Sequence, residues 1–135
     1  AKLAGFDDAI ALNEHGEVAE GSIMNLFLVS RGKLITPKTT DSILKGITRD
    51  TIINIAKDNG IEVEERAVQR TELYLADEAF YCGTSAQVVP ITSIDNRNLG
   101  NGEIGPVVKK LQDIYFDVVR GKIAKYKEWC MPIYD

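Results

Sequence analysis

Short apolar runs separated by polar turns fill the first third of the chain. Residues 9–12 (AIAL) precede the polar cluster 13–17, and residues 18–22 follow it as a return segment. A second pair, 26–29 (LFLV) and 33–36 (KLIT), is separated by Ser30-Arg31-Gly32. Apolar runs that end in Gly-containing polar turns are typical of antiparallel hairpins. The polar segment 37–42 is then expected to be a loop.

The period changes after this loop. From Thr48 to Asn59, isoleucine and alanine recur at helical spacing, with Asp50 in the first turn and Gly60 directly after the last. An acidic first turn and a terminal glycine are typical helix signals. The pattern therefore predicts a helix over 48–59, and the alternation in residues 61–64 predicts a strand after it.

The remaining segments complete a mixed pattern. Residues 71–76 predict a short helical turn with Thr71 as its N-cap, and residues 78–82 predict a strand. Residues 88–91 and the turn 95–98 predict one more hairpin. Pro106 opens a long apolar stripe that runs to Gly121, which predicts the clearest helix of the chain. The sum is an α+β domain with an antiparallel or mixed sheet, a central helix and a long C-terminal helix.

Composition limits the class of protein. The chain has 135 residues, 44% of them hydrophobic, with a net charge of −4, which fits one globular domain and excludes wholesale disorder. The acidic balance predicts no nucleic-acid partner, and no apolar run is long enough to cross a membrane. Two cysteines are too few for a disulfide framework and indicate a reducing, cytoplasmic location.

Thr48 follows Leu44-Lys45-Gly46-Ile47 at the predicted start of the central helix. The unpaired N–H groups of a first helical turn, together with a hydroxyl, can hold an anion such as phosphate. Gly46 would let the backbone approach such a ligand closely. The alternative is that Thr48 simply caps its helix.

Two further segments could carry chemistry. Gly83-Thr84-Ser85 ends a predicted strand and could hold an anion through its N–H groups and hydroxyls, or could be an ordinary turn. Glu20 stands among small and apolar residues and could pair with a cationic ring nitrogen, or could be an exposed strand carboxylate. His15 is expected in a solvated turn and Cys82 in the core, and no motif suggests a metal site.

At these three segments the chain resembles the class IV pyridoxal-phosphate aminotransferases, and within them the branched-chain amino-acid aminotransferases. The resemblance runs through the whole chain in order. It includes residues 5–12, Glu20-Gly21-Ser22 with Asn25-Leu26-Phe27, residues 44–50, residues 75–80 with 83–86, Gly100-Asn101-Gly102, Gly105-Pro106 and residues 115–121. It implies the large C-terminal cofactor-binding domain of the D-amino-acid aminotransferase-like fold over residues 1–135.

The resemblance also implies roles for single residues. Glu20 would pair with the protonated ring nitrogen of pyridoxal 5′-phosphate, and Leu44 would pack on the ring. The N–H groups of Ile47 and Thr48, behind Gly46, would hold the phosphate together with the hydroxyls of Thr48 and Thr84. The N–H groups of Thr84 and Ser85 would receive the substrate carboxylate.

The chain departs from the family pattern in two ways. Ile23-Met24 replaces the frequent Gly-Glu, which bears on substrate preference. The Schiff-base lysine and the N-terminal domain are expected outside these residues, and Lys2 does not match the position of that lysine. These 135 residues should therefore be inactive alone.

The implied activity of the full-length enzyme is transamination of leucine, isoleucine or valine with 2-oxoglutarate. The implied partners are small amino acids and 2-oxo acids, with a homo-oligomeric full-length protein. The alternatives are a D-amino-acid aminotransferase, an aminodeoxychorismate lyase, or a non-catalytic binding or assembly module.

Overall fold

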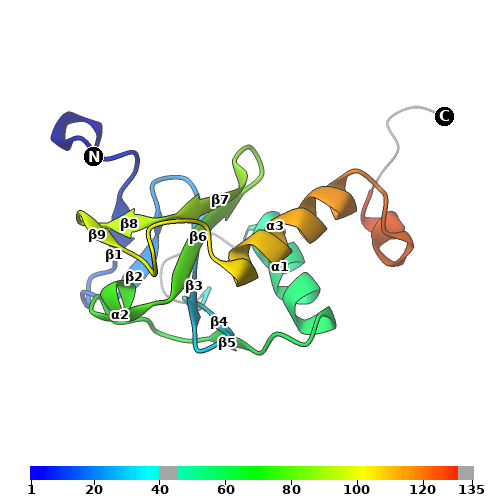
Figure 1. Ribbon diagram of the computed structural model, residues 1–135, viewed down its shortest axis with the longest axis horizontal. Coiled ribbons are helices and arrows are strands. Elements are labelled where there is room, and N and C mark those ends of the chain that lie inside the picture. The colour runs from blue at the N-terminus through cyan, green and yellow to red at the C-terminus, as the bar shows by residue number, and fades with distance from the viewer. Residues whose placement is uncertain (40–45, 131–135) are drawn as a thin grey trace.

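The computed structural model describes residues 1–39 and 46–130. Its centre is a five-stranded sheet in the order β5-β4-β3-β6-β7 (Figure 1). The strands are β3 (Asn25–Ser30), β4 (Lys33–Thr36), β5 (Val63–Glu65), β6 (Glu78–Gly83) and β7 (Gln87–Ile91). Within this sheet only the β4–β5 pair is parallel, so the sheet is mixed. The sequence pattern predicted an antiparallel or a mixed sheet, and the mixed form is the one observed.

Strand β3 lies in the middle of the sheet and is buried on both faces. Phe27 stacks on Phe80 of β6, directly opposite in register, with ring centroids 4.9 Å apart. Phe27 and Val29 face one core cluster, while Leu26 and Leu28 face another. Successive side chains of a strand point to opposite faces, which explains why this run is apolar throughout.

Two helices cover one face of the sheet. They are α1 (Ile47–Asp58) and α3 (Pro106–Val119), on one side of the sheet in Figure 1. Their buried residues include Ile52 and Ile55 of α1 and Leu111 and Tyr115 of α3. Both predicted helices are confirmed, with α1 shifted by one residue towards the N-terminus.

Smaller elements cover the other face. They are β1 (Ile10–Leu12), β2 (Val18–Gly21), α2 (Glu72–Leu75), β8 (Ser93–Ile94) and β9 (Arg97–Asn98). The N-terminal turn η1 (Lys2–Ala4) is exposed and buries no residue. The β1–β2 and β3–β4 hairpins are confirmed. The chain ends its described part with η2 (Ala124–Trp129), a 3-10 segment that the sequence pattern did not predict.

The last predicted hairpin is wrong in its partners. Residues 88–91 belong to β7 and pair with β6, while the turn at Asp95-Asn96 joins β8 to β9. Both turn residues have positive φ, at 50° and 62°, which suits a tight two-residue hairpin. The short β8 and β9 carry too little alternation to reveal this pairing in the sequence.

Candidate functional site

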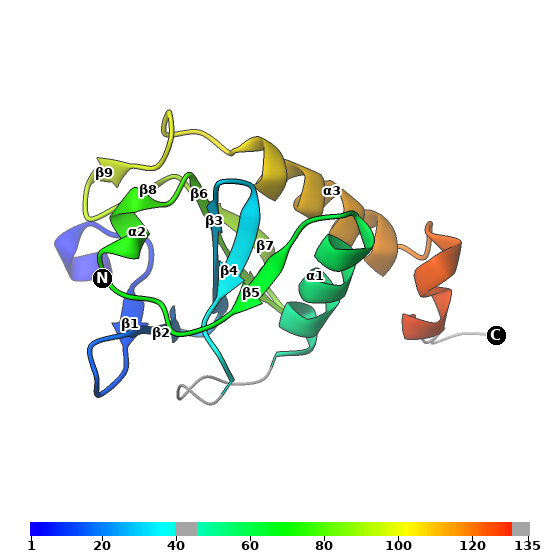
Figure 2. The same ribbon diagram turned by 90° about the horizontal axis from the view of Figure 1, so that it is seen from below.

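The predicted site segments meet at one end of the β3–β6 pair. Asn25 at the start of β3 lies opposite Cys82, one residue before Gly83 and the turn that follows β6. Gly46, directly before α1, packs against the Asn25 side chain so closely that a methyl group there would overlap the amide oxygen. The Gly21 N–H at the end of β2 donates a hydrogen bond to the Met24 carbonyl (2.8 Å). Figure 2 shows β2 and the start of α1 along the same edge of the molecule.

The start of α1 is open. Gly46 is the N-cap, with φ −83° and ψ 136°, and no side chain in residues 1–39 or 46–130 caps the helix. Thr48 is the second helical residue and is buried, so the alternative that it caps the helix is wrong. Among the described residues, no acceptor binds the N–H groups of Ile47 and Thr48. As far as the described residues go, these two N–H groups are available to bind an anion at the helix terminus.

The turn after β6 is a three-residue hairpin loop. Gly83 pairs with Gln87, and Gln87 has a positive φ of 62°. Thr84 and Ser85 are exposed at the tip, at the same end of the sheet as α1's first turn. The geometry suits an ordinary turn and also leaves both hydroxyls accessible to a ligand.

Glu20 lies on β2 and is partly buried between Ala19 and Gly21, which are both buried. It is therefore not the fully exposed strand carboxylate of the alternative interpretation. Beside it, Gly21 packs against the ring of Tyr81, and burial together with the nearby charge of Asp8 raises the pKa of Tyr81 to about 12. A carboxylate in such a half-enclosed place can pair with a cation of a ligand.

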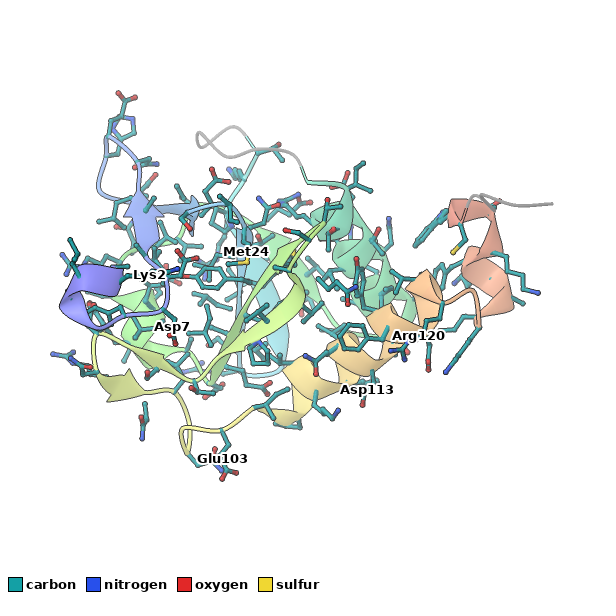
Figure 3. All side chains as sticks on the ribbon, turned by 90° about the horizontal axis from the view of Figure 1, so that it is seen from above. Lys2, Asp7, Met24, Glu103, Asp113 and Arg120 are labelled. Carbon is teal, nitrogen blue, oxygen red and sulfur yellow. The ribbon has the colours of Figure 1, made fainter. Side chains whose placement is uncertain are left out.

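The Ile23-Met24 departure borders a large cavity of about 1210 Å³. Ile23 is 80% exposed, while Met24 packs on the core and lies near the centre of the molecule in Figure 3. The Met24 side chain would contact a methyl group placed on Gly83 at 3.4 Å. The departure therefore lies next to the turn expected to bind substrate.

Lys2 lies at the N-terminal helical turn in Figure 3 and also lines the cavity. It is exposed.

Leu44, predicted to pack on the cofactor ring, lies outside the described residues. Within the described ranges, no group of three or more His, Cys, Asp or Glu side chains could hold a metal. No helix in those ranges is long and apolar enough to span a membrane. Cys82 is buried and His15 is exposed in its turn, as predicted, and both cysteines are free thiols.

Sequence reasoning missed two residues of this site. The amide of Asn25 packs on Gly46, and the guanidinium of Arg49 in the first turn of α1 is 1% exposed. Asn25 gave no local signal, because its contact joins residues far apart in the chain. Arg49 did give one, since a cation in a first helical turn opposes the helix dipole.

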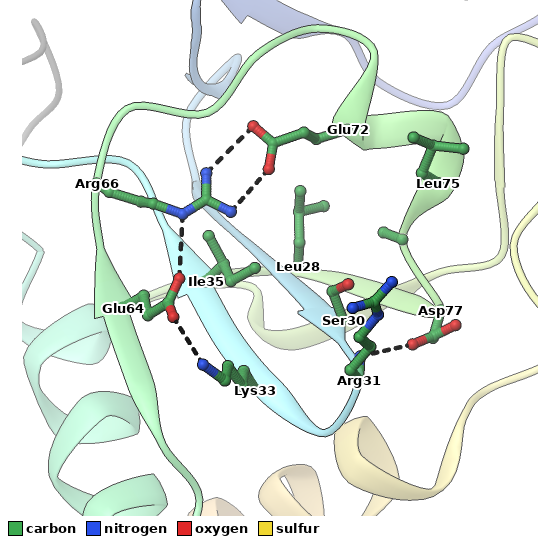
Figure 4. Close-up of a pocket in the computed structure, with 11 residues that line it drawn as sticks. Leu28, Ser30, Arg31, Lys33, Ile35, Glu64, Arg66, Glu72, Leu75 and Asp77 are labelled. Atoms are coloured by element: carbon green, nitrogen blue, oxygen red, sulfur yellow. Dashed lines mark hydrogen bonds and ion pairs between the residues drawn. The ribbon is translucent and has the colours of Figure 1, made fainter.

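A second cavity, of about 550 Å³, lies at the opposite end of β3 (Figure 4). An ion-pair chain crosses it: Arg66 binds both carboxylate oxygens of Glu72 and also Glu64, which pairs with Lys33. Most of the charged side chains that line this cavity form ion pairs with one another. This arrangement is typical of a structural network rather than of a binding site.

Comparison with known proteins defines the class. The family model of class IV aminotransferases (Amino-transferase class IV) matches residues 1–94, which is more than half of the chain. The chain belongs to the class IV aminotransferases.

Individual relatives narrow the class. The chain is 54% identical to a probable branched-chain-amino-acid aminotransferase of Aquifex aeolicus, over all of this chain and 44% of that protein. It is 46% identical to the branched-chain-amino-acid aminotransferase of Pseudomonas aeruginosa, over 93% of this chain and 40% of that protein. The chain thus spans less than half the length of these curated relatives.

Solved structures agree. The branched-chain amino acid aminotransferase of Thermobaculum terrenum in its PLP-form is 50% identical, with a TM-score of 0.97 over 100% of this chain and 44% of that one. The enzyme of Thermoproteus uzoniensis with norvaline is 48% identical, with a TM-score of 0.95 over 99% of this chain and 44% of that one. The predicted α+β fold of this family is confirmed.

Proposed function

We propose that these residues are the cofactor-binding, C-terminal part of a branched-chain amino-acid aminotransferase. The proposed reaction of the intact protein exchanges the amino group of leucine, isoleucine or valine with 2-oxoglutarate. The observation that carries this proposal is the gathering of an open helix start, a partly buried carboxylate and a hydroxyl-bearing turn at one end of the sheet. The names of the relatives favour branched-chain substrates over D-amino acids or aminodeoxychorismate.

The residues present fit pyridoxal 5′-phosphate. The N–H groups of Ile47 and Thr48, which have no acceptor among the described residues, and the Thr48 hydroxyl supply donors for a phosphate. Gly46 has no side chain that would crowd the helix start. When bound, the cofactor supplies an electron sink for the substrate's α-carbon.

In this proposal the residues divide the tasks, and Thr84 has two of them. Ile47, Thr48 and the Thr84 hydroxyl bind phosphate, and Leu44 packs on the ring. Glu20 keeps a proton on the ring nitrogen by stabilising the positive charge there. The N–H groups of Thr84 and Ser85 orient the substrate carboxylate.

The assay of the intact protein decides between the candidate activities. With pyridoxal phosphate, leucine and 2-oxoglutarate, we expect glutamate and the branched 2-oxo acid to form in equal amounts. D-Alanine and aminodeoxychorismate serve as comparison substrates, and activity on either of these alone would overturn the proposal. No activity on any of them would favour a non-catalytic module.

A carboxylate variant tests the chemistry at the ring nitrogen. Glu20→Ala should lower kcat by at least about a hundredfold while changing cofactor retention little, because the phosphate contacts hold the cofactor. Glu20→Gln is the matched control, since it keeps the size but loses the charge, and it should also be slow. Normal turnover in both variants would exclude the proposed role.

The lysine that anchors the cofactor is proposed to lie upstream in the intact protein. Reading the parent coding sequence for a lysine upstream of residue 1 is the most direct check. The 135 residues alone should then show no turnover with the same substrates. Enzyme-like turnover by this piece would place the anchoring lysine within it.

The cellular setting is part of the proposal as well. Two free cysteines favour a reducing cytoplasm. A homo-oligomer of the intact protein is proposed from the resemblance, and light scattering on the purified protein measures its mass directly.

A further inference from the structure

Arg49 combines two unfavourable features in one side chain. It is the third residue of α1, where the helix dipole places partial positive charge, and its side chain is 1% exposed. A cation is normally stabilised at a helix C-terminus and in water rather than here. Such a break of a local rule is expected at functional sites, where another group compensates for it.

The partners of Arg49 in the described structure neutralise it only partly. Its Nη2 donates hydrogen bonds to the Pro37 carbonyl (3.0 Å) and to Glu65 Oε1 (2.7 Å), and its Nη1 lies 3.6 Å from Asp50 Oδ1. The Pro37 carbonyl is neutral, and both carboxylates have side chains that are 44% exposed, so water screens their charge. Its Nε is buried with no acceptor among the described residues.

Arg49 lies beside the candidate site. The Cβ of Arg49 lies 3.6 Å from the position of a methyl group on Gly46. Its field also reaches Cys82, where burial raises the thiol pKa to about 12 and the Arg49 charge opposes that rise. Cys82 directly precedes Gly83, so the guanidinium lies close enough to act on the end of β6 that leads into the candidate turn.

We infer that Arg49 is a positioning residue for the phosphate: its buried charge favours the dianion at the start of α1, and its hydrogen bonds to Pro37 and Glu65 hold that helix start in place. The inference rests on the proposed function. Arg49 acts through space and through the first turn of α1, because its terminal nitrogens are engaged by Pro37, Glu65 and Asp50.

The test compares two ligands that differ only in the phosphate. Dissociation constants of pyridoxal phosphate and of pyridoxal are measured for the intact protein and for Arg49→Met. In the variant, the dissociation constant of pyridoxal phosphate should rise by at least about tenfold and that of pyridoxal by less than about threefold. An equal loss for both ligands means a merely structural role and overturns the inference.

Two matched variants keep the test decisive if Arg49→Met does not fold. Arg49→Lys retains the charge, so its preference for pyridoxal phosphate over pyridoxal, the ratio of the two affinities, should stay within about threefold of that of the unaltered protein. A tenfold fall in this preference would overturn the inference. Glu65→Gln keeps an acceptor for Nη2 but removes a counter-charge, so the ratio should stay equal or rise. A fall in Glu65→Gln would likewise count against an electrostatic role.

The ³¹P resonance of bound pyridoxal phosphate gives an independent reading. In the unaltered protein the phosphate should stay dianionic to a lower pH than in Arg49→Met, because the buried cation stabilises the dianion. Identical ³¹P titrations would overturn the inference. If the unaltered protein binds both ligands equally, the proposed phosphate site itself is wrong, which separates the two failures.

Discussion

The two long helices of this chain begin at opposite ends of the same strand pair, and their starts are built differently. At the start of α3, the Glu78 carboxylate of β6 accepts hydrogen bonds from the N–H groups of Val107 (3.2 Å) and Val108 (2.8 Å). At the start of α1, no described side chain accepts from the first N–H groups, and the charged side chains of its first turn are the buried Arg49 cation and the partly exposed Asp50 carboxylate. One helix start is closed by the protein's own anion, and the other has no such acceptor in the described part of the chain.

The similarity of the two starts sharpens this difference. Each helix follows a glycine, Gly105 or Gly46, on which a polar strand side chain packs closely: Glu78 at α3 and Asn25 at α1. In register, Glu78 lies opposite Val29 and Asn25 opposite Cys82, near the two ends of β3 and β6. A carboxylate neutralises a helix start, while an amide leaves room for an external anion.

The largest expected effect comes from removing the internal anion. Glu78→Ala should destabilise the protein by about 2–3 kcal/mol, because two first-turn N–H groups of α3 lose their acceptors in a buried place. Amide hydrogen exchange should quicken in the first turns of α3 more than in α1. Glu78→Gln keeps an acceptor and should lose less stability than Glu78→Ala. Equal losses of stability in the two variants would mean that packing alone matters.

The second-largest loss of stability is expected from adding a side chain at the start of α1. Gly46→Ala should cost about 1–2 kcal/mol, because its backbone (φ −83°) accepts alanine but the new methyl group overlaps the Asn25 amide. Urea unfolding of the cofactor-free protein measures this cost. Adding Asn25→Ala should relieve the overlap, and a double variant less stable than the sum of the single changes would contradict this explanation.

Thr48→Ala should separate stability from binding. Without ligand we expect less than about 0.5 kcal/mol of change, since Thr48 is not the helix cap. The affinity for pyridoxal phosphate should fall by about tenfold through loss of one hydroxyl donor. Thr48→Ser restores the hydroxyl and should restore binding, and a Ser variant as weak as the Ala variant would exclude a hydroxyl contact.

The smallest effect is expected at a third helix start, where the carboxylate is near the surface. Glu72 opens α2, accepts a hydrogen bond from the Gln69 N–H, and is paired with Arg66 (Figure 4). The side-chain hydrogen bond from Arg66 lowers the pKa of Glu72 below its ordinary 4.5. A lowered folded-state pKa stabilises the protein above the unfolded pKa, and this stabilisation is lost as pH falls through the folded value.

Glu72→Gln should therefore cost about 0.5 kcal/mol at pH 7 and almost nothing near pH 2. Thermal unfolding midpoints across this pH range measure the difference between the variant and the unaltered protein. A difference that grows as the pH falls would have the wrong sign for this ion pair.

Much of the fold was readable from local pattern. The helical period around Ile52 and Ile55 predicts α1 within one residue, and Gly60 marks its end with a φ of 74°. Pro106 marks the start of α3, because the first N–H groups of a helix have no partner within the helix and a proline there loses no hydrogen bond. These signals lie within one or two turns of the chain and need no distant partner.

The pairing of segments was harder to predict. β7 pairs with β6 and β8 pairs with β9. Strand pairing is set by the pattern of apolar side chains that face the core, and short strands contain too few residues to show that pattern. Candidate ligand groups at Glu20, Thr48 and Thr84 were readable as weak motifs, but nothing local placed them at one end of the sheet. Leu44 stays a prediction, because it lies outside the described residues.

The sequence by itself determined the α+β class, the two long helices and the hydroxyls and carboxylate of the candidate site, because propensity, capping and period act between near neighbours. The tertiary structure alone decided that Gly46 packs on Asn25, that Glu78 closes α3, and that Arg49 is buried at the start of α1. Asn25 and Gly46 are 21 positions apart, Glu78 and Val108 are 30 positions apart, and Arg49 is held by Pro37 and Glu65. These contacts arise only when the sheet brings those segments together.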